Sequence, residues 1–259
     1  MKQIPNIFTL LNLICGCIAI AYTMQNGITI QYDGDGAQFI DLSEKLWMAS
    51  LFIGIAAVVD FLDGFVARLF NASSEMGKQL DSLADVVSFG VAPSMIIYQF
   101  LRMSFASNEG GIDTSIFLLV PAFIIAASGA YRLARFNLDT SRQYGFKGVP
   151  IPAAGLLIAS LPLIYWNSTN ATILGLVTNK SFLYALIFIV SGLMVSKLPL
   201  MALKFKNLSV KDNLSKFILI IFSIVAAIIF SQHLQLFLLQ LFRFLLLNII
   251  LFVYQFLHH

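Results

Sequence analysis

Eight apolar segments, each about as long as a membrane span, constrain this chain more than any other feature of its sequence. A helix needs about 20 apolar residues to cross the roughly 30 Å hydrocarbon core of a bilayer. The segments cover residues 5–26, 46–70, 82–105, 115–137, 150–167, 180–199, 214–231 and 234–257. We therefore expect an all-α integral membrane protein with about eight spans.

Charged residues are correspondingly scarce. Asp, Glu, Lys and Arg make up 11% of the chain, against roughly 25% in soluble domains. Too little charge remains to cover a water-facing surface, so the composition excludes a soluble enzyme, a disordered chain and a nucleic-acid-binding protein. Cys15 and Cys17, two apart in an apolar run, indicate neither a disulfide framework nor a zinc site.

The distribution of Lys and Arg predicts the orientation in the membrane. With eight spans, 12 of the 16 basic residues fall on the side of the N-terminus and three on the opposite side. Cytoplasmic loops are enriched in Lys and Arg, so both termini are predicted to face the cytoplasm. The opposite loop 27–44 is acidic and is predicted to lie outside the cell membrane.

Four aspartates stand where two of these spans meet the cytoplasm. Asp60 and Asp63 end the second span, and Asp81 and Asp85 open the third. Spacings of three and four residues place each pair on one helix face. A short loop joins the two antiparallel helices, so we expect the two pairs to converge.

Converging carboxylates repel one another unless cations lie between them. Oxygen-only ligands suit Mg²⁺, Mn²⁺ or Ca²⁺, and two metal ions roughly 4 Å apart form a clamp for displacement at phosphorus. Gly64 leaves room for a phosphate beside Asp63, and Arg68 offers a donor fork for phosphate oxygens. A divalent-cation or proton-coupled transporter is the alternative of another class. It is disfavoured because the acids gather at one face and no inverted repeat of interrupted helices is evident.

The complete spacing D-x-x-D-G-x-x-A-R-x8-G-x3-D-x3-D runs from Asp60 to Asp85 and resembles the signature of the CDP-alcohol phosphotransferase family. The resemblance implies transfer of a substituted phosphate from a CDP-linked alcohol to a second alcohol, with release of CMP. It also implies a six-helix core, here residues 1–199, and a homodimer. Residues 200–259 would then add a transmembrane hairpin to that core.

The same resemblance implies roles for individual residues. The ligands of two divalent cations, Mg²⁺ or Mn²⁺, would be Asp60, Asp63, Asp81 and Asp85. Asp85 would also be the general base for the attacking hydroxyl group. The CDP moiety would be held by Gly64, Arg68 and Ser74.

Further segments resemble the phosphatidylserine synthase branch of that family. They are Ser88-Phe-Gly-Val-Ala-Pro93, Arg132-Leu-Ala-Arg135-Phe-Asn137 and the run 146–152. This resemblance implies CDP-diacylglycerol and L-serine as substrates. Thr9 and Asn12 share a helix face near the N-terminus and either reach the cytidine of the CDP-lipid or bond across helices.

Four residues are candidates for binding the acceptor alcohol or a phosphate. Ser88 lies one helical turn from Asp85, and the cationic candidates are Arg132, Arg135 and Lys147. The sequence leaves open which cation binds the carboxylate of serine. The same basic group would also suit glycerol 3-phosphate or inositol phosphate, so these acceptors remain alternatives.

Overall fold

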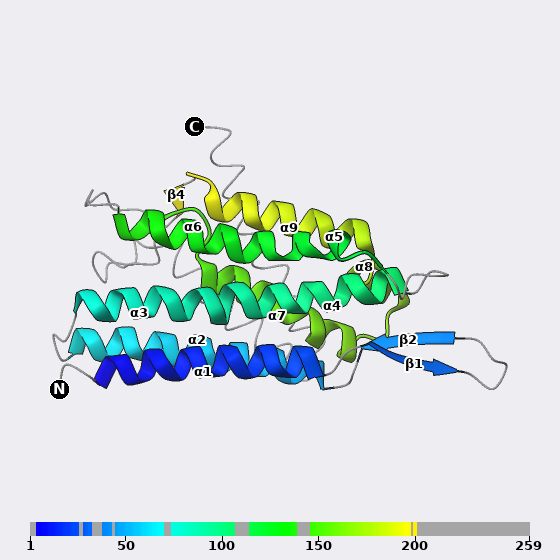
Figure 1. The fold of residues 1–259 in the computed structure, drawn as a ribbon, viewed down its shortest axis with the longest axis horizontal. Helices are drawn as coiled ribbons and strands as arrows, with labels where there is room; N and C mark the ends of the chain where they lie inside the picture. The colour runs from blue at the N-terminus through cyan, green and yellow to red at the C-terminus, as the bar shows by residue number, and fades with distance from the viewer. Residues whose placement is uncertain are drawn as a thin grey trace, which may run out of the picture.

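In the computed structural model the protein is an elongated bundle of roughly parallel and antiparallel helices (Figure 1). The structure describes residues 4–25, 28–32, 38–42, 45–69, 74–106, 114–138, 146–197 and 199–200. The first six predicted spans all coincide with helices in this part of the chain. Two predicted spans lie outside the described residues, 214–231 and 234–257. The same holds for the predicted hairpin 200–259, of which only residue 200 is described.

Among the described residues, four helical stretches are long and apolar enough to cross a membrane. They are α1 (Ile4–Gln25), α2 (Leu46–Leu69), the continuous run of α3 (Glu75–Asp85), η1 (Val86–Val91) and α4 (Ala92–Ala106), and the run of α5 (Ile116–Leu119), η3 (Val120–Phe123) and α6 (Ile124–Leu138). A fifth follows if α8 (Ala171–Val177) and α9 (Lys180–Val195), which bend by 58°, count as one span. Helix α7 (Ile151–Asn167), which follows α6 and precedes α8 in the chain, has 17 residues, a length of about 25 Å.

The third helix begins at Glu75, seven residues before the predicted start of its span at 82. Ser74 is its N-cap, and the Ser74 hydroxyl accepts a hydrogen bond from the Gly77 amide at 3.0 Å. Capping residues of this kind satisfy amides that the first helical turn leaves free. The added turns carry the polar residues Glu75 and Lys78, so the helix extends beyond the apolar segment that defined the prediction.

A π-helical turn, η1, interrupts the third span directly after Asp85. The Ala92 amide donates to the carbonyl of Val87, five residues back. Pro93 has no amide hydrogen, and its ring would clash with the carbonyl of Phe89 in a regular α-helix, which accounts for the wider turn here. Such turns are frequent at functional sites, and this one directs a buried face of the helix toward α1, α6 and α7.

In the part of the chain that the structure describes, two short strand pairs accompany the helices. The all-α prediction did not include these strands. β1 (Ile28–Tyr32) and β2 (Gln38–Leu42) pair in antiparallel fashion within the predicted external loop. Their β-branched and aromatic residues favour strands. β3 (Phe146–Lys147) pairs with β4 (Pro199–Leu200) at the opposite end of the bundle, near the ends of α6 and α9 in Figure 1.

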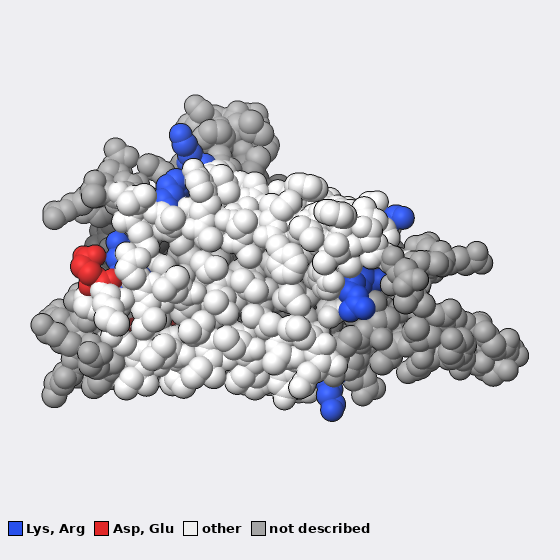
Figure 2. Space-filling view, viewed as in Figure 1, with Lys and Arg blue, Asp and Glu red and all other residues white. Residues whose placement is uncertain are grey.

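The exterior of the bundle is apolar around its middle. In the face shown in Figure 2, the charged side chains gather toward the two ends and leave an uncharged band between them. Large side chains such as Phe61, Leu83 and Phe117 are at least 65% exposed. This inverted arrangement, with apolar groups outside and acids partly inside, is the one that a lipid environment favours.

Candidate active site

The four predicted aspartates meet at one end of the bundle, where α2 ends and α3 begins. One carboxylate oxygen each from Asp60, Asp63 and Asp81 lies within 4.8 Å of the others. Asp85 follows one turn after Asp81 on α3. Asp63 and Asp85 are each only 7% exposed. The predicted convergence of the two acidic helices is therefore confirmed for Asp60, Asp63 and Asp81.

Such a cluster fits a divalent cation. Two like charges about 4 Å apart repel by roughly 4 kcal/mol at an effective dielectric constant of about 20, so bare carboxylates at these separations need compensation. Asp81 Oδ1 is buried and has no hydrogen-bond partner among the described residues, which leaves it free to bind a metal ion. The donor set contains only oxygen, as Mg²⁺, Mn²⁺ and Ca²⁺ prefer.

Two residues of α1 contact the acids directly. The Thr9 hydroxyl donates to Asp63 Oδ2 at 2.9 Å, and the Asn12 amide donates to Asp85 Oδ1 at 3.4 Å. Both side chains are buried. The sequence offered them as ligands of the CDP-lipid or as links between helices, and the contacts of the structure are of the second kind.

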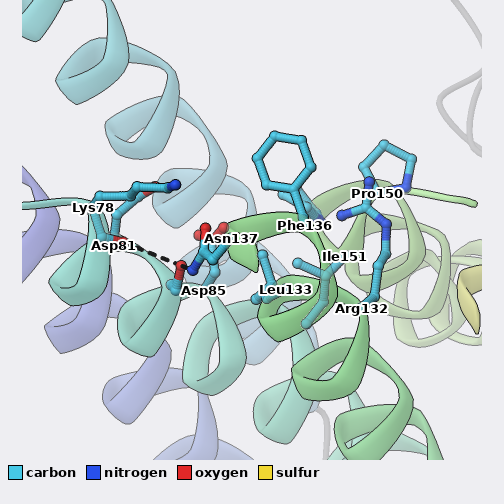
Figure 3. Close-up of a pocket in the computed structure, with 11 residues that line it drawn as sticks. Lys78, Asp81, Asp85, Arg132, Leu133, Phe136, Asn137, Pro150 and Ile151 are labelled. Carbon is cyan, nitrogen blue, oxygen red and sulfur yellow. Dashed lines mark hydrogen bonds between the residues drawn. The ribbon is translucent and has the colours of Figure 1, made fainter. Parts of the chain in front are cut away.

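A cavity of about 190 Å³ opens beside Asp81 and Asp85. It lies between α3, α6 and the start of α7, and Figure 3 shows its lining. The polar residues that line it are Lys78, Asp81, Ser82, Asp85, Arg132 and Asn137. Its apolar wall consists of Leu133, Phe136, Pro150, Ile151 and Pro152. The cavity thus brings two aspartates of the carboxylate cluster and two basic side chains, Lys78 and Arg132, into one lining.

Arg132 is the buried cation of this cavity. Only 5% of its surface is exposed, and it lines the same cavity as Asp85. Its Nε atom is buried without a hydrogen-bond partner in the described part of the chain. A buried guanidinium with a free donor is suited to an anionic ligand such as a carboxylate or phosphate.

Arg135, three residues further along α6, does not line the cavity. Its guanidinium donates to the carbonyl oxygens of Val195 and Ser196, at 2.7 and 3.0 Å. These carbonyls belong to the end of α9, where a helix leaves acceptors without partners of its own. The structure therefore gives Arg135 a different contact from the serine or phosphate that the sequence indicated.

The remaining predicted residues occupy varied positions. The Ser88 hydroxyl is buried and donates to the backbone carbonyl of Asn12 at 2.9 Å, away from the cavity lining. A side chain added at Gly64 would meet nothing within 4 Å, so this helix face is open as predicted. Ser74 caps α3. Arg68 lies on α2 and Lys147 on β3, but their side chains fall outside the described residues.

Sequence reasoning gave no role to three polar residues of the cavity, Lys78, Ser82 and Asn137. Asn137 donates to the Ser82 hydroxyl at 2.8 Å and so joins α6 to α3, the dashed line in Figure 3. A signal was available for two of them. Lys78 and Ser82 share a helix face with Asp81 and Asp85, because their separations follow the i, i+3, i+4, i+7 pattern.

The fold and the site define a helical membrane protein of several spans with a carboxylate cluster beside a basic cavity. Comparison with known families gives the class a name. The family model described as CDP-alcohol phosphatidyltransferase matches residues 2–196, which is most of the chain. The chain belongs to this family.

Several curated relatives share substantial sequence with this chain. A protein of Helicobacter pylori strain 26695 named CDP-diacylglycerol–serine O-phosphatidyltransferase is 35% identical over 234 residues, which cover 89% of this chain and 83% of the relative. The protein of that name from Bacillus subtilis is 35% identical over 166 residues, 64% of this chain and 78% of the relative. An archaetidylserine synthase from Methanothermobacter thermautotrophicus is 34% identical over 126 residues, 48% of this chain and 50% of the relative.

Proposed function

We propose that this protein transfers the phosphatidyl group of CDP-diacylglycerol to the hydroxyl group of L-serine, which yields phosphatidylserine and CMP. The observation that carries the proposal is the cavity that the buried Arg132 and the carboxylate of Asp85 both line. Serine needs a cation for its carboxylate and a base beside its hydroxyl, and this cavity supplies both. The names of the relatives from H. pylori and B. subtilis support the same acceptor.

The reaction is a single displacement at phosphorus. Asp85 accepts the proton of the serine hydroxyl, and the serine oxygen forms a bond to the phosphorus that carries the diacylglycerol group. The bond between that phosphorus and the oxygen of CMP breaks, and CMP leaves with the electron pair. Arg132 and Lys78 bind the carboxylate of serine and hold its hydroxyl beside Asp85. Positioning of this kind supplies a large part of the rate enhancement in phosphoryl transfer.

The carboxylate cluster is the proposed site of two divalent cations, Mg²⁺ or Mn²⁺. Asp60, Asp63 and Asp81 are the ligands that the geometry brings together, with Asp85 beside them. When bound, the cations neutralise charge on the pyrophosphate of the CDP-lipid and on the departing CMP. The open face at Gly64 leaves space for that pyrophosphate, and Arg68 follows one turn later on the same helix as its proposed donor.

The arrangement in the membrane is also a proposal. We infer that the site and both termini face the cytoplasm of a multi-pass cell-membrane protein, because most Lys and Arg residues flank that side. Eight spans, a core of residues 1–199 with an added hairpin at 200–259, and a homodimer complete the proposal. Fusion of a periplasm-sensitive reporter to the loop 27–44 and to the N-terminus tests the orientation.

A screen of acceptor alcohols tests the function. Purified protein with CDP-diacylglycerol and Mn²⁺ is expected to release CMP with L-serine and to form phosphatidylserine. Glycerol 3-phosphate and inositol phosphate, tested at equal concentration, are expected to give little CMP. Turnover with either phosphate-bearing alcohol and none with serine would refute the serine assignment while leaving the class of reaction intact.

A further inference from the structure

Helix α1 carries no residue of the acidic motif, yet it contacts both halves of it. Thr9 and Asn12 lie three residues apart on one face of α1. Thr9 reaches Asp63 on α2, and Asn12 reaches Asp85 at the end of α3. One short stretch of α1 therefore bridges the two helices whose carboxylates form the cluster.

The bridging segment is itself firmly held. Asn12 is fully buried and Thr9 is 3% exposed. The Ser88 hydroxyl donates to the Asn12 carbonyl at 2.9 Å, which ties α1 to η1 next to Asp85. One turn further on, a side chain added at Gly16 would meet Ser88 Cβ at 3.0 Å, so the two helices are in close contact at this point.

A hydrogen bond to a carboxylate oxygen restricts the rotation of the carboxyl group and directs its remaining lone pairs. In metal sites, partners of this kind orient the ligands, and their removal typically costs 10–100-fold in metal affinity or activity. The hydrogen bond from Thr9 reaches Oδ2 of Asp63 but not Oδ1. The hydrogen bond from Asn12 reaches Oδ1 of Asp85 but not Oδ2. Each bond thus restrains one oxygen of its carboxylate.

We propose that Thr9 and Asn12 are positioning residues of the carboxylate cluster: Thr9 orients Asp63 for cation binding, and Asn12 orients Asp85 for proton transfer. Neither residue then needs to contact the nucleotide. The proposal rests on the carboxylate site of the proposed function, but it does not depend on which alcohol is the acceptor.

Mn²⁺ binding to the purified full-length protein tests the role of Thr9 without any turnover. Electron paramagnetic resonance of free Mn²⁺ gives the affinity in the absence of substrate. Thr9→Val is expected to weaken Mn²⁺ binding by about 10–100-fold, whereas Thr9→Ser, which keeps the hydroxyl, stays near the wild type. Thr23→Val is the matched control. Both hydroxyls are buried on α1 and donate to the carbonyl four residues back, Thr23 to Ala19 and Thr9 to Pro5, but of these two hydroxyls Thr9 alone also bonds to a carboxylate among the described residues.

Thr9→Ala serves as a second variant if Thr9→Val does not yield a monodisperse protein. Wild-type affinity for Mn²⁺ in the folded Thr9→Val or Thr9→Ala protein would overturn the role of Thr9. If the wild-type protein binds Mn²⁺ but does not turn over serine, the proposed function fails, and the comparison of Mn²⁺ affinities still decides this inference.

Steady-state kinetics test the role of Asn12. Asn12→Leu is expected to lower kcat by about 10–100-fold while the KM for CDP-diacylglycerol stays within about twofold of the wild type. A residue that bound cytidine would give the opposite pattern, a raised KM with kcat retained. That pattern in Asn12→Leu would overturn its assignment as a positioning residue.

Discussion

Replacement of Arg132 by Met is the most direct test of the acceptor cavity. The variant keeps an unbranched side chain of similar length but removes the guanidinium of a residue that is only 5% exposed. A hydrogen bond to a charged group contributes about 1.5–3 kcal/mol. At about 1.4 kcal/mol for each factor of ten, the loss corresponds to about 10–150-fold in kcat/KM for serine. Arg132→Lys keeps the charge without the planar fork, so its kcat/KM for serine is expected to lie between the values of the wild type and of Arg132→Met.

The assay is CMP release at saturating CDP-diacylglycerol with serine varied over a wide range. Arg135→Met on the same helix is the control, because Arg135 contacts the end of α9 and does not line the cavity. It is expected to keep the KM for serine and to lower the temperature of unfolding. An unchanged kcat/KM for serine in Arg132→Met, or an equal loss in Arg135→Met, would refute the assignment of Arg132 to the serine carboxylate.

Three further predictions concern the base, the packing and the cations. Asp85→Asn is expected to lose at least about 10²-fold in turnover and still bind CDP-diacylglycerol in an equilibrium assay; near-normal turnover would disprove Asp85 as the base. Gly155→Ala places a Cβ 2.9 Å from the backbone of Phe89 and is expected to lower the free energy of unfolding by about 1–3 kcal/mol, measured by thermal unfolding in detergent. Gly175→Ala, whose Cβ would meet nothing within 4 Å, is its control, and equal destabilisation of both would contradict the packing argument. EDTA is expected to abolish CMP release, and Mn²⁺ to restore it; full activity in excess EDTA would mean that the carboxylate cluster works without a cation.

Helix positions and the acidic cluster were predictable because both depend on spacing along the chain. The length of the apolar segments predicted the positions of the first six spans. Hydropathy did not predict the polar first turns of α3 or the separate helix α8. The strand pair β1–β2 escaped it as well, since the hairpin lies outside the apolar segments.

The choice between Arg132 and Arg135 was not predictable in the same way. The two residues are three apart, so they share a helix face by spacing. What separates them is the position of α9, whose terminal carbonyls accept hydrogen bonds from Arg135, whereas Arg132 lines the cavity with Asp85. Nothing local to α6 encodes the position of a helix about 60 residues away, and packing between the helices decides it.

The sequence by itself determined that this chain enters a membrane and brings four carboxylates together at the end of two helices. Both follow from local rules: the length of an apolar run and the periodicity of a helix. Only the tertiary structure decided that α1 packs against both acidic helices, so that Thr9 and Asn12 bond to Asp63 and Asp85. It also decided that Lys78 and Asn137 line one cavity with Arg132. Such contacts join residues more than 50 positions apart, and they depend on how close-packed helices fit against one another rather than on spacing along the chain.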